Sequence, residues 1–323
     1  MVAELGLGDV QSVVPLTGGV ASDIAVVDLG TRRLCVKFAL SKLRVAEDWQ
    51  APLHRNRAEY AWLQFAAAVA PESAVELFGR SDAQHGFAMA FVEGDDVRLW
   101  KAELLAGRTG RDEAAGVGNL LGRIHAASTA PDADRSPFRN RDDFRALRIE
   151  PYLSFAAGRH PAVAAELHEL GDLLYASEQV LVHGDVSPKN VLLRRGRPVI
   201  LDAECATLGD PCFDVSFCLN HLVLKAVHVT ALRGSFAALV DGFWQAYVTH
   251  VTWEPVTDLE RRVCRLLPAL MLARIDGKSP VEYLTEDERE RVRRLALGWV
   301  RQPVGTLASF VQELVSREKD IAT

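Results

Sequence analysis

The sequence predicts an α+β fold of two lobes, in which residues 1–93 form a small lobe of antiparallel strands with one helix and residues 94–323 form a larger, mostly helical lobe. Three observations support this prediction. The chain has 323 residues, which exceeds the usual size of a single hydrophobic core. Short apolar runs separated by glycine-containing breaks concentrate before residue 94. Apolar residues at helical spacing dominate after it, so we expect a functional site between two unlike lobes.

The composition is that of a globular protein that binds small molecules rather than nucleic acid. Apolar residues make up 49% of the chain, charged residues 25%, and the formal net charge is −6. Because binding to nucleic-acid phosphates relies on clustered Lys and Arg, this balance argues against nucleic acid as a general partner. No apolar run reaches the roughly 18 residues of a membrane span, and the first residues lack the basic segment of a signal peptide. We therefore expect a cytoplasmic protein without a membrane partner, and the oligomeric state stays open.

The cysteines indicate neither a disulfide framework nor a zinc site. They are odd in number and form no CxxC pair. We interpret them as small residues of the hydrophobic core. The five positions are Cys35, Cys205, Cys212, Cys218 and Cys264.

The small lobe is predicted to be an antiparallel meander with one helix. Glycine and Asp-x-Gly breaks between its apolar runs are typical of turns. A stretch of alanines interspersed with aromatic and leucine residues favours a helix between the third and fourth strands. We expect strands at Ser12–Leu16, Ile24–Asp28, Arg33–Phe38 and Phe87–Val92, and the helix at Asn56–Ala68.

The large lobe is predicted to be helical apart from one local group of strands. Apolar residues recur at i, i+3, i+4 and i+7 in its longer segments, as expected for amphipathic helices. We expect helices at Glu113–Ala127, Pro161–Ser177, Ser235–Thr249 and Asp258–Ile275, and strands at Val180–Val182, Asn190–Leu193 and Pro198–Leu201.

The most specific feature lies in this strand group. His183-Gly184-Asp185 is followed by Asn190, and Asp202 comes directly after the next apolar strand. Phosphoryl transfer from ATP needs a carboxylate beside the attacking hydroxyl and oxygen ligands that hold Mg²⁺ against the phosphates. A hairpin that begins at Asn190 and ends at Asp202 brings both ligand candidates to one end of the strands.

With this motif the chain resembles the aminoglycoside phosphotransferase and choline kinase-like superfamily, whose bilobal fold is similar to that of protein kinases. His183-Gly184-Asp185 with Asn190 matches the HGDxxxxN loop of that superfamily, and Asp202 matches the aspartate that takes the place of the protein-kinase DFG. The resemblance implies ATP and Mg²⁺ as cofactors. Chemistry and resemblance agree on Asp185 as the catalytic base and on Asn190 and Asp202 as magnesium ligands.

The resemblance also implies an ion pair in the small lobe. Lys37, in the third expected strand, lies where the superfamily places its phosphate-binding lysine, as in the VAIK pattern of protein kinases. We expect its partner on the helix, at Glu59. Glu47 is closer in sequence, but the following segment 49–52 indicates a loop.

Two backbone segments are further candidates for nucleotide contacts. A glycine turn before Lys37 is expected over the triphosphate, although an ordinary hairpin turn explains the same glycines equally well. The last strand of the small lobe resembles the hinge whose backbone holds adenine. The residues are Gly18, Gly19 and Ser22 in the turn, and Met89, Ala90 and Val92 in the hinge.

The residues after Asp202 are similar to the methylthioribose kinase branch, which carries a D-x-E pair and a later F-D pair. Glu204 is accordingly a candidate to contact metal or substrate, and Asp214 matches a residue that braces the catalytic loop. The loop itself departs from the HGDLHTGS of that branch at Ser187 and Asn190. The other candidates for substrate contacts are Arg148, Tyr152, Arg274 and Asp276.

The sequence thus predicts an ATP- and Mg²⁺-dependent phosphotransferase that acts on a hydroxyl of a small, polar, sugar-like metabolite. An aminoglycoside antibiotic phosphotransferase is the alternative enzyme, although acidic and basic residues nearly balance from Cys205 onward, where such polycations need carboxylates. A protein kinase is disfavoured because HGD replaces HRD and no APE motif follows. A catalytically inactive nucleotide-binding scaffold is disfavoured by the joint presence of Lys37, Asp185, Asn190 and Asp202.

Overall fold

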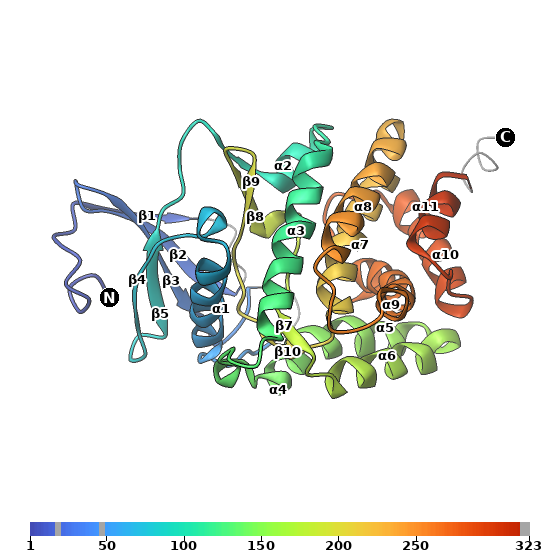
Figure 1. Ribbon diagram of the computed structural model, residues 1–323, viewed down its shortest axis with the longest axis horizontal. Coiled ribbons are helices and arrows are strands. Elements are labelled where there is room, and N and C mark those ends of the chain that lie inside the picture. The colour runs from blue at the N-terminus through green and yellow to red at the C-terminus, as the bar shows by residue number, and fades with distance from the viewer. Residues whose placement is uncertain (17–20, 45–48, 317–323) are drawn as a thin grey trace.

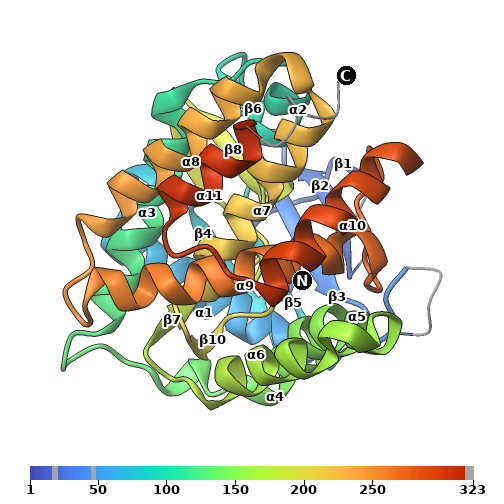
Figure 2. The same cartoon turned by 90° about the vertical axis from the view of Figure 1, so that its right-hand side faces the viewer.

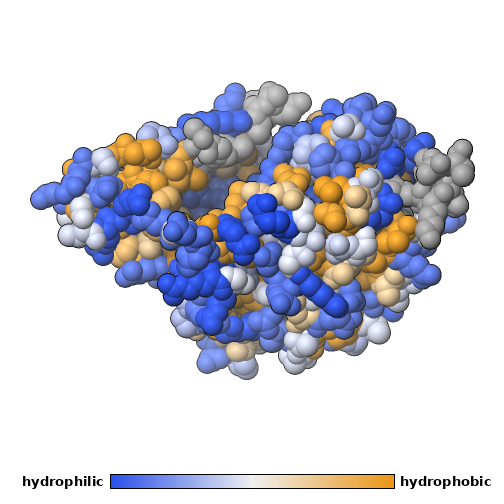
Figure 3. Space-filling model, turned by 90° about the horizontal axis from the view of Figure 1, so that it is seen from above, coloured by the Kyte–Doolittle hydropathy of each residue, from blue (hydrophilic) through white to orange (hydrophobic). Residues whose placement is uncertain are grey.

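The computed structural model describes residues 1–16, 21–44 and 49–316, and these residues form two lobes (Figure 1). The small lobe contains a five-stranded sheet and helix α1 (Arg55–Val69), and the helices from α2 onward lie in the large lobe. Figure 3 shows a notch between the two lobes on the face seen from above. The predicted α+β fold is confirmed, and the boundary at residue 93 stays a prediction.

The sheet of the small lobe is antiparallel throughout and runs in the order β1-β2-β3-β5-β4. Residues that alternate along β3 and β5 point to opposite faces of the sheet. Cys35 and Met89 belong to the main hydrophobic core, whereas Leu34, Val36 and Ala88 form a second cluster on the other face. The strands are β1 (Ser12–Leu16), β2 (Ser22–Asp28), β3 (Arg33–Ala39), β4 (Leu77–Ser81) and β5 (Gly86–Ala90).

Two packed helix pairs form the body of the large lobe (Figure 2). Helix α3 (Arg111–Ser128) packs against α8 (Arg233–Val248), and α7 (Cys212–His228) packs against α9 (Val256–Asp276). The other helices are α2 (Trp100–Leu105), α4 (Arg141–Phe144), the π-helix η3 (Arg145–Ser154), α5 (Phe155–Arg159), α6 (Ala164–Ala176), α10 (Glu286–Arg301) and α11 (Leu307–Ser316).

Two small sheets of the large lobe lie between its helices and the small lobe. In the first, β6 (Val97–Leu99) pairs with β8 (Val191–Arg194), which forms the predicted hairpin with β9 (Arg197–Ile200). In the second, β7 (Val180–Val182) pairs with β10 (Thr207–Gly209). The segment between β7 and β8 carries the HGD motif, so both sheets hold the ends of that segment.

The elements predicted for the small lobe and the hairpin are confirmed to within a few residues, but β4 was missed, and so were helices of the large lobe, among them α10 and α7. Every residue of α7 from Cys212 to Val227 is buried, so the helix lacks the polar face that produces an amphipathic pattern. The strand predicted over Phe87–Val92 ends at Ala90. Among the described helices none is long and apolar enough by itself to cross a membrane, and α7 passes that test only together with Thr230–Val248, across a bend of 118°.

Candidate active site

Asp214 anchors the backbone of residues 183–190, a loop that we call the catalytic loop. The backbone N–H groups of His183 and Gly184 donate to its two carboxylate oxygens, at 2.6 and 2.8 Å. Asp214 lies in the first turn of α7, is fully buried and also contacts His125 at 3.3 Å. Gly184 has a φ of 80°, and a Cβ there would lie 2.8 Å from a neighbouring side chain, so the turn requires glycine. The bracing role predicted for Asp214 agrees with these contacts.

His183 links the catalytic loop to the strand that precedes Asp202. Its Nδ1 accepts from the backbone N–H of Asp185 at 3.0 Å, and its Nε2 lies 3.1 Å from the carbonyl oxygen of Leu201. The ring packs edge-on against Trp62, and burial lowers the pKa of the imidazole. A neutral ring with its proton on Nε2 satisfies both contacts, so His183 acts as a structural hydrogen-bonding group.

The Asp185 carboxylate has one oxygen engaged and one oxygen free. Its Oδ2 lies 3.1 Å from Nη2 of Arg148 and 3.2 Å from Nζ of Lys189. Its Oδ1 is buried and has no hydrogen-bond partner among the described residues. Buried carboxylate oxygens are seldom left unpaired, so Oδ1 is placed to accept a hydrogen bond from a ligand. The attraction of Asp185 also raises the pKa of Lys189 and keeps that ammonium charged.

The two residues predicted to hold Mg²⁺ lie at the same end of the β8–β9 hairpin. The backbone N–H of Leu201 donates to the carbonyl of Asn190 at 2.9 Å, which fixes Asp202 next to the end of the catalytic loop. The Asn190 side-chain Nδ2 donates to the Asp185 carbonyl at 3.1 Å, so its amide oxygen is left to face a ligand. Asp202 has a φ of 72°, an uncommon value for a residue other than glycine. An amide oxygen and a carboxylate are the hard donors that Mg²⁺ accepts, and they fit this metal.

Lys37 connects the small lobe to the end of the hairpin that carries the predicted magnesium ligands. Its Nζ donates to Glu59 on α1 at 2.8 Å and also contacts Asp202. Burial would lower the pKa of Lys37, but Asp202 and Glu59 together raise it above its usual range, so the ammonium stays charged. Burial likewise opposes ionisation of Asp202, yet Lys37 holds the pKa of that carboxyl below its usual range. The predicted pairing of Lys37 with Glu59 is present in the structure.

A second ion pair between the lobes involves a residue that the sequence reasoning missed. Nε of Arg55 donates to Glu204 at 3.0 Å, and another of its N–H groups binds the carbonyl of Ala21. Arg55 is 1% exposed, so this pair is shielded from water. Glu204, predicted to approach metal or substrate, therefore has a fixed protein partner. Arg55 precedes Glu59 by four residues on α1, and that i, i+4 spacing was the available signal.

The expected triphosphate turn is only partly described. Gly18 and Gly19 lie outside the described residues. Ser22, the third residue of that prediction, begins β2, lies opposite Ala39 of β3 and is buried.

The expected hinge spans the end of β5. Met89 lies opposite Cys35 in β3, which places it on the same sheet face as Lys37. The N–H of Ala90 donates to the Glu76 carbonyl at 2.8 Å, and Val92 lies beyond the end of the strand.

Three of the predicted substrate residues form a connected group next to Asp185. Arg148 and Tyr152 lie on the π-helix η3, and such helices are rare and often occur at functional sites. The guanidinium of Arg148 lies 5.9 Å from the Tyr152 ring, and Nη1 of Arg274 donates to the Tyr152 hydroxyl at 3.4 Å. A continuous contact path thus leads from Asp185 through Arg148 and Tyr152 to Arg274.

Asp276 lies in a different ion-pair cluster. Arg293 of α10 donates to both of its carboxylate oxygens, at 2.8 and 2.9 Å, and His160 contacts it at 2.8 Å. The structure therefore ties Asp276 to helix packing, away from the group around Asp185.

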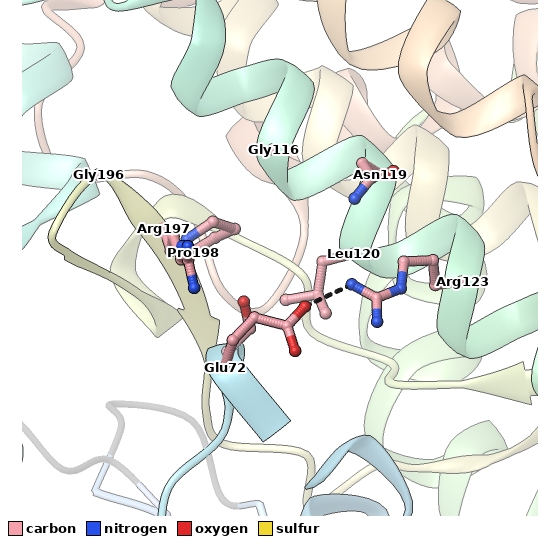
Figure 4. Close-up of a pocket in the computed structure, with 9 residues that line it drawn as sticks. Glu72, Gly116, Asn119, Leu120, Arg123, Gly196, Arg197 and Pro198 are labelled. Carbon is pink, nitrogen blue, oxygen red and sulfur yellow. Dashed lines mark hydrogen bonds and ion pairs between the residues drawn. The ribbon is translucent and has the colours of Figure 1, made fainter. Parts of the chain in front are cut away.

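A surface pocket of ≈ 560 Å³ lies between α3 and the β8–β9 hairpin (Figure 4). Its lining includes Glu72, whose carboxylate receives a 2.6 Å bond from Arg123. The lining shares no residue with the catalytic loop, so this pocket is separate from the candidate active site.

Comparison with known proteins identifies the family. Residues 12–262 match the phosphotransferase enzyme family (APH). The chain belongs to this family. It is 23% identical over 254 residues to the methylthioribose kinase of Yersinia enterocolitica, covering 70% of this chain and 62% of the relative. It is 26% identical over 227 residues to that of Pectobacterium carotovorum, covering 61% and 56%. The chain therefore spans less than two thirds of the length of these relatives, and its predicted membership and class, a phosphotransferase, are confirmed.

Solved structures of similar fold support the bilobal kinase-like architecture. The macrolide 2'-phosphotransferase MphH of Brachybacterium faecium aligns with a TM-score of 0.52 at 18% identity, covering 92% of this chain and 98% of that one. Amicoumacin kinase hAmiN, in complex with AMP-PNP and Ca²⁺, aligns with a TM-score of 0.55 at 14% identity, covering 92% and 90%. At such identities the likeness concerns the fold alone.

Proposed function

We propose that this protein is an ATP- and Mg²⁺-dependent kinase that transfers the γ-phosphate of ATP to a hydroxyl group of a small, polar, sugar-like metabolite. The Asp185 carboxylate carries this proposal. Two cations hold one of its oxygens, Asp214 fixes the backbone around it, and the buried Oδ1 has no partner among the described residues. This is the arrangement that orients an attacking hydroxyl.

In the proposed reaction, Asp185 Oδ1 accepts a hydrogen bond from the acceptor hydroxyl and takes its proton as the new O–P bond forms. Phosphoryl transfer passes through a loose transition state, so orientation contributes more than base strength. The charge on Lys37 is directed at the phosphates of the nucleotide, and Glu59 keeps that side chain extended across the sheet. Asn190 and Asp202 would hold Mg²⁺, which neutralises phosphate charge when bound. Transfer is direct, without a phosphoenzyme.

The relatives support a sugar-like acceptor and the use of a nucleotide with a divalent cation. The curated relatives are methylthioribose kinases, which favours a sugar-like acceptor, and hAmiN was solved with a nucleotide analogue and a divalent cation. A cytoplasmic protein that acts on free small molecules, without nucleic-acid or membrane partners, is part of this proposal.

The test is a screen of the purified protein with ATP and Mg²⁺ against pooled sugars, nucleosides, amino alcohols and aminoglycosides, with ADP release as the readout. We expect acceptor-dependent ADP release that is lost in Asp185→Ala. Acceptor-dependent release that persists in Asp185→Ala would overturn the assignment of Asp185. If only aminoglycosides caused ADP release, the acceptor would be an aminoglycoside antibiotic and the proposal of a sugar-like metabolite would be wrong.

A further inference from the structure

Lys225 is a buried lysine with no carboxylate partner among the residues that the structure describes. It lies on α7, is 1% exposed, and its Nζ reaches only the backbone carbonyl of His221, at 3.4 Å. The ring of Tyr283 lies 4.9 Å from Nζ, and the ion pairs among the described residues include none to Lys225. Burying an unpaired charge is costly, and an anionic ligand would supply the opposite charge.

Other cations surround Lys225 from neighbouring elements. Arg274 of α9 donates to Tyr152 and to the Ser279 hydroxyl, at 3.4 and 2.9 Å, and has no carboxylate partner among the described residues. Lys101 of α2 pairs with Glu282, which is largely exposed. Burial first, and then Lys101 and Arg274, lower the pKa of Lys225 to about 7. Like charges brought together in this way attract an anion.

Three unpaired polar atoms belong to the same cluster. Nε of Arg274, Nε2 of His221 and the hydroxyl oxygen of Tyr283 are buried and lack hydrogen-bond partners among the described residues. They come from α9, from α7 and from the segment between α9 and α10. Unsatisfied buried groups are rare in folded proteins, and a guanidinium N–H, an imidazole N–H and a phenol O–H are all donors that an oxyanion accepts from.

The cluster is continuous with the catalytic carboxylate. Arg148 contacts Asp185 and lies 5.9 Å from the rings of both Tyr152 and Phe217. The Phe217 ring in turn lies 5.5 Å from that of His221, one turn before Lys225 on α7. Side-chain contacts therefore connect the cluster to Asp185.

We propose that the phosphate acceptor carries an anionic group, a carboxylate or a phosphate, that binds the cluster of Lys225, Arg274 and His221. This inference rests on the proposed kinase function and narrows its substrate class. Polycationic acceptors such as aminoglycosides are disfavoured by the same charges. The nucleotide phosphates do not compete for this cluster, because their expected partner is Lys37 of the small lobe.

The test compares acceptors that differ only in charge. Sugar acids are assayed beside their methyl esters, and sugar phosphates beside the free sugars, with ADP release as the readout. We expect kcat/KM for the anionic member of a productive pair to exceed that for its neutral partner at least tenfold, since a charge-assisted hydrogen bond contributes about 1.5–3 kcal/mol. The acid and phosphate pairs distinguish the two kinds of anion. Lys225→Met is expected to reduce this ratio about tenfold, and Arg274→Gln similarly.

Lys278→Met is the matched control, because Lys278 lies over the Phe155 ring, outside the cluster. It should leave the ratio unchanged. A second readout does not depend on turnover: inorganic phosphate and gluconate should raise the Tm of the wild type more than that of Lys225→Met. Equal stabilisation of both proteins, or equal kcat/KM for charged and neutral members, overturns the anionic acceptor while leaving the kinase intact. Acceptor-dependent ADP release that is unchanged in Asp185→Ala overturns the kinase mechanism instead.

Discussion

The two sides of the catalytic loop have opposite charge balances. On the proposed nucleotide side, Glu59, Asp202 and Glu204 form ion pairs with two cations among the described residues, Lys37 and Arg55. On the acceptor side, five cations face two carboxylates: Arg148, Lys189, Lys101, Arg274 and Lys225 against Asp185 and Glu282. A surplus of carboxylates suits a site that receives Mg²⁺, and a surplus of cations suits one that receives an anion.

The two sides also differ in whether their buried cations have carboxylate partners in the absence of a ligand. Lys37 and Arg55 are each bound by carboxylates from the other lobe, so the nucleotide side is largely paired. Lys225 and Arg274 have no such partners among the described residues. Structural ion pairs therefore hold the lobes together, whereas the proposed acceptor side keeps buried cations without carboxylates, which lowers stability.

The largest effect should come from removing the carboxylate shared by both sides. Asp185→Asn keeps the shape but removes the proton acceptor, so turnover should fall roughly 10²- to 10⁴-fold while nucleotide binding stays near that of the wild type. Steady-state ADP release and nucleotide titration measure the two quantities. Asp172→Asn, on the exposed face of α6, is the control and should not change turnover. Full turnover in Asp185→Asn would contradict the proposed base.

The paired character of the nucleotide side predicts a large loss of stability when one partner is removed. Arg55→Met leaves the buried Glu204 without its cation and should lower the free energy of unfolding by about 3 kcal/mol or more. Chemical denaturation measures this change. Arg57→Met, on the same helix, breaks only an exposed pair with Asp82 and should change it by less than about 1 kcal/mol. Equal losses in the two variants would show that the Arg55 pair is not special.

The carboxylate surplus predicts a metal response that depends on Asp202. In Asp202→Ala, Mg²⁺ should no longer strengthen nucleotide binding, and affinity in its presence should fall at least about tenfold. Titration of a nucleotide with and without Mg²⁺ provides the measurement. Asp82→Ala, at an exposed turn, should retain the wild-type response. A normal response in Asp202→Ala would refute the ligand role.

The unpaired cation of the acceptor side predicts a small gain in stability. Lys225→Met fills a similar space without the buried charge and should raise the Tm at pH 6 by roughly 2 °C or more. The pKa of Lys225 is about 7 in the folded protein, below its ordinary value of 10.5. Burial lowers this pKa most, and Lys101 and Arg274 lower it further, whereas Glu282 raises it. Between these pH values the unfolded chain binds more protons, so the wild type gains stability as pH rises.

The advantage of Lys225→Met should therefore shrink between pH 6 and pH 9.5, as measured by thermal unfolding of both proteins. An advantage that is the same at both pH values would mean that Lys225 does not titrate in this window.

The sequence was a good guide wherever function depends on residues near one another in the chain. Asp185 and Asn190 lie on one loop, and the apolar strand that ends before Asp202 predicted the hairpin that joins them. Lys37 and Glu59 were paired because an expected strand and an expected helix each offered one suitable residue.

The sequence failed to predict the buried helix α7. Because α7 is buried around its whole circumference, it produced no periodic pattern, and neither the helix nor Lys225 was predicted. Asp276 was chosen with Arg274 because the run 272–277 lies where the methylthioribose kinase branch places substrate-contacting residues. Its carboxylate instead binds α10, because residues two apart on a helix point in different directions.

The sequence by itself determined the reaction class, because phosphoryl transfer needs few residue types at short, recognisable spacings. Only the tertiary structure decided which charges are neutralised by partners and which are left for ligands. Arg55 finds Glu204 across the lobes, while Lys225 finds no carboxylate among the described residues. Electrostatic compensation depends on distance and burial, and neither is written in the order of residues along the chain.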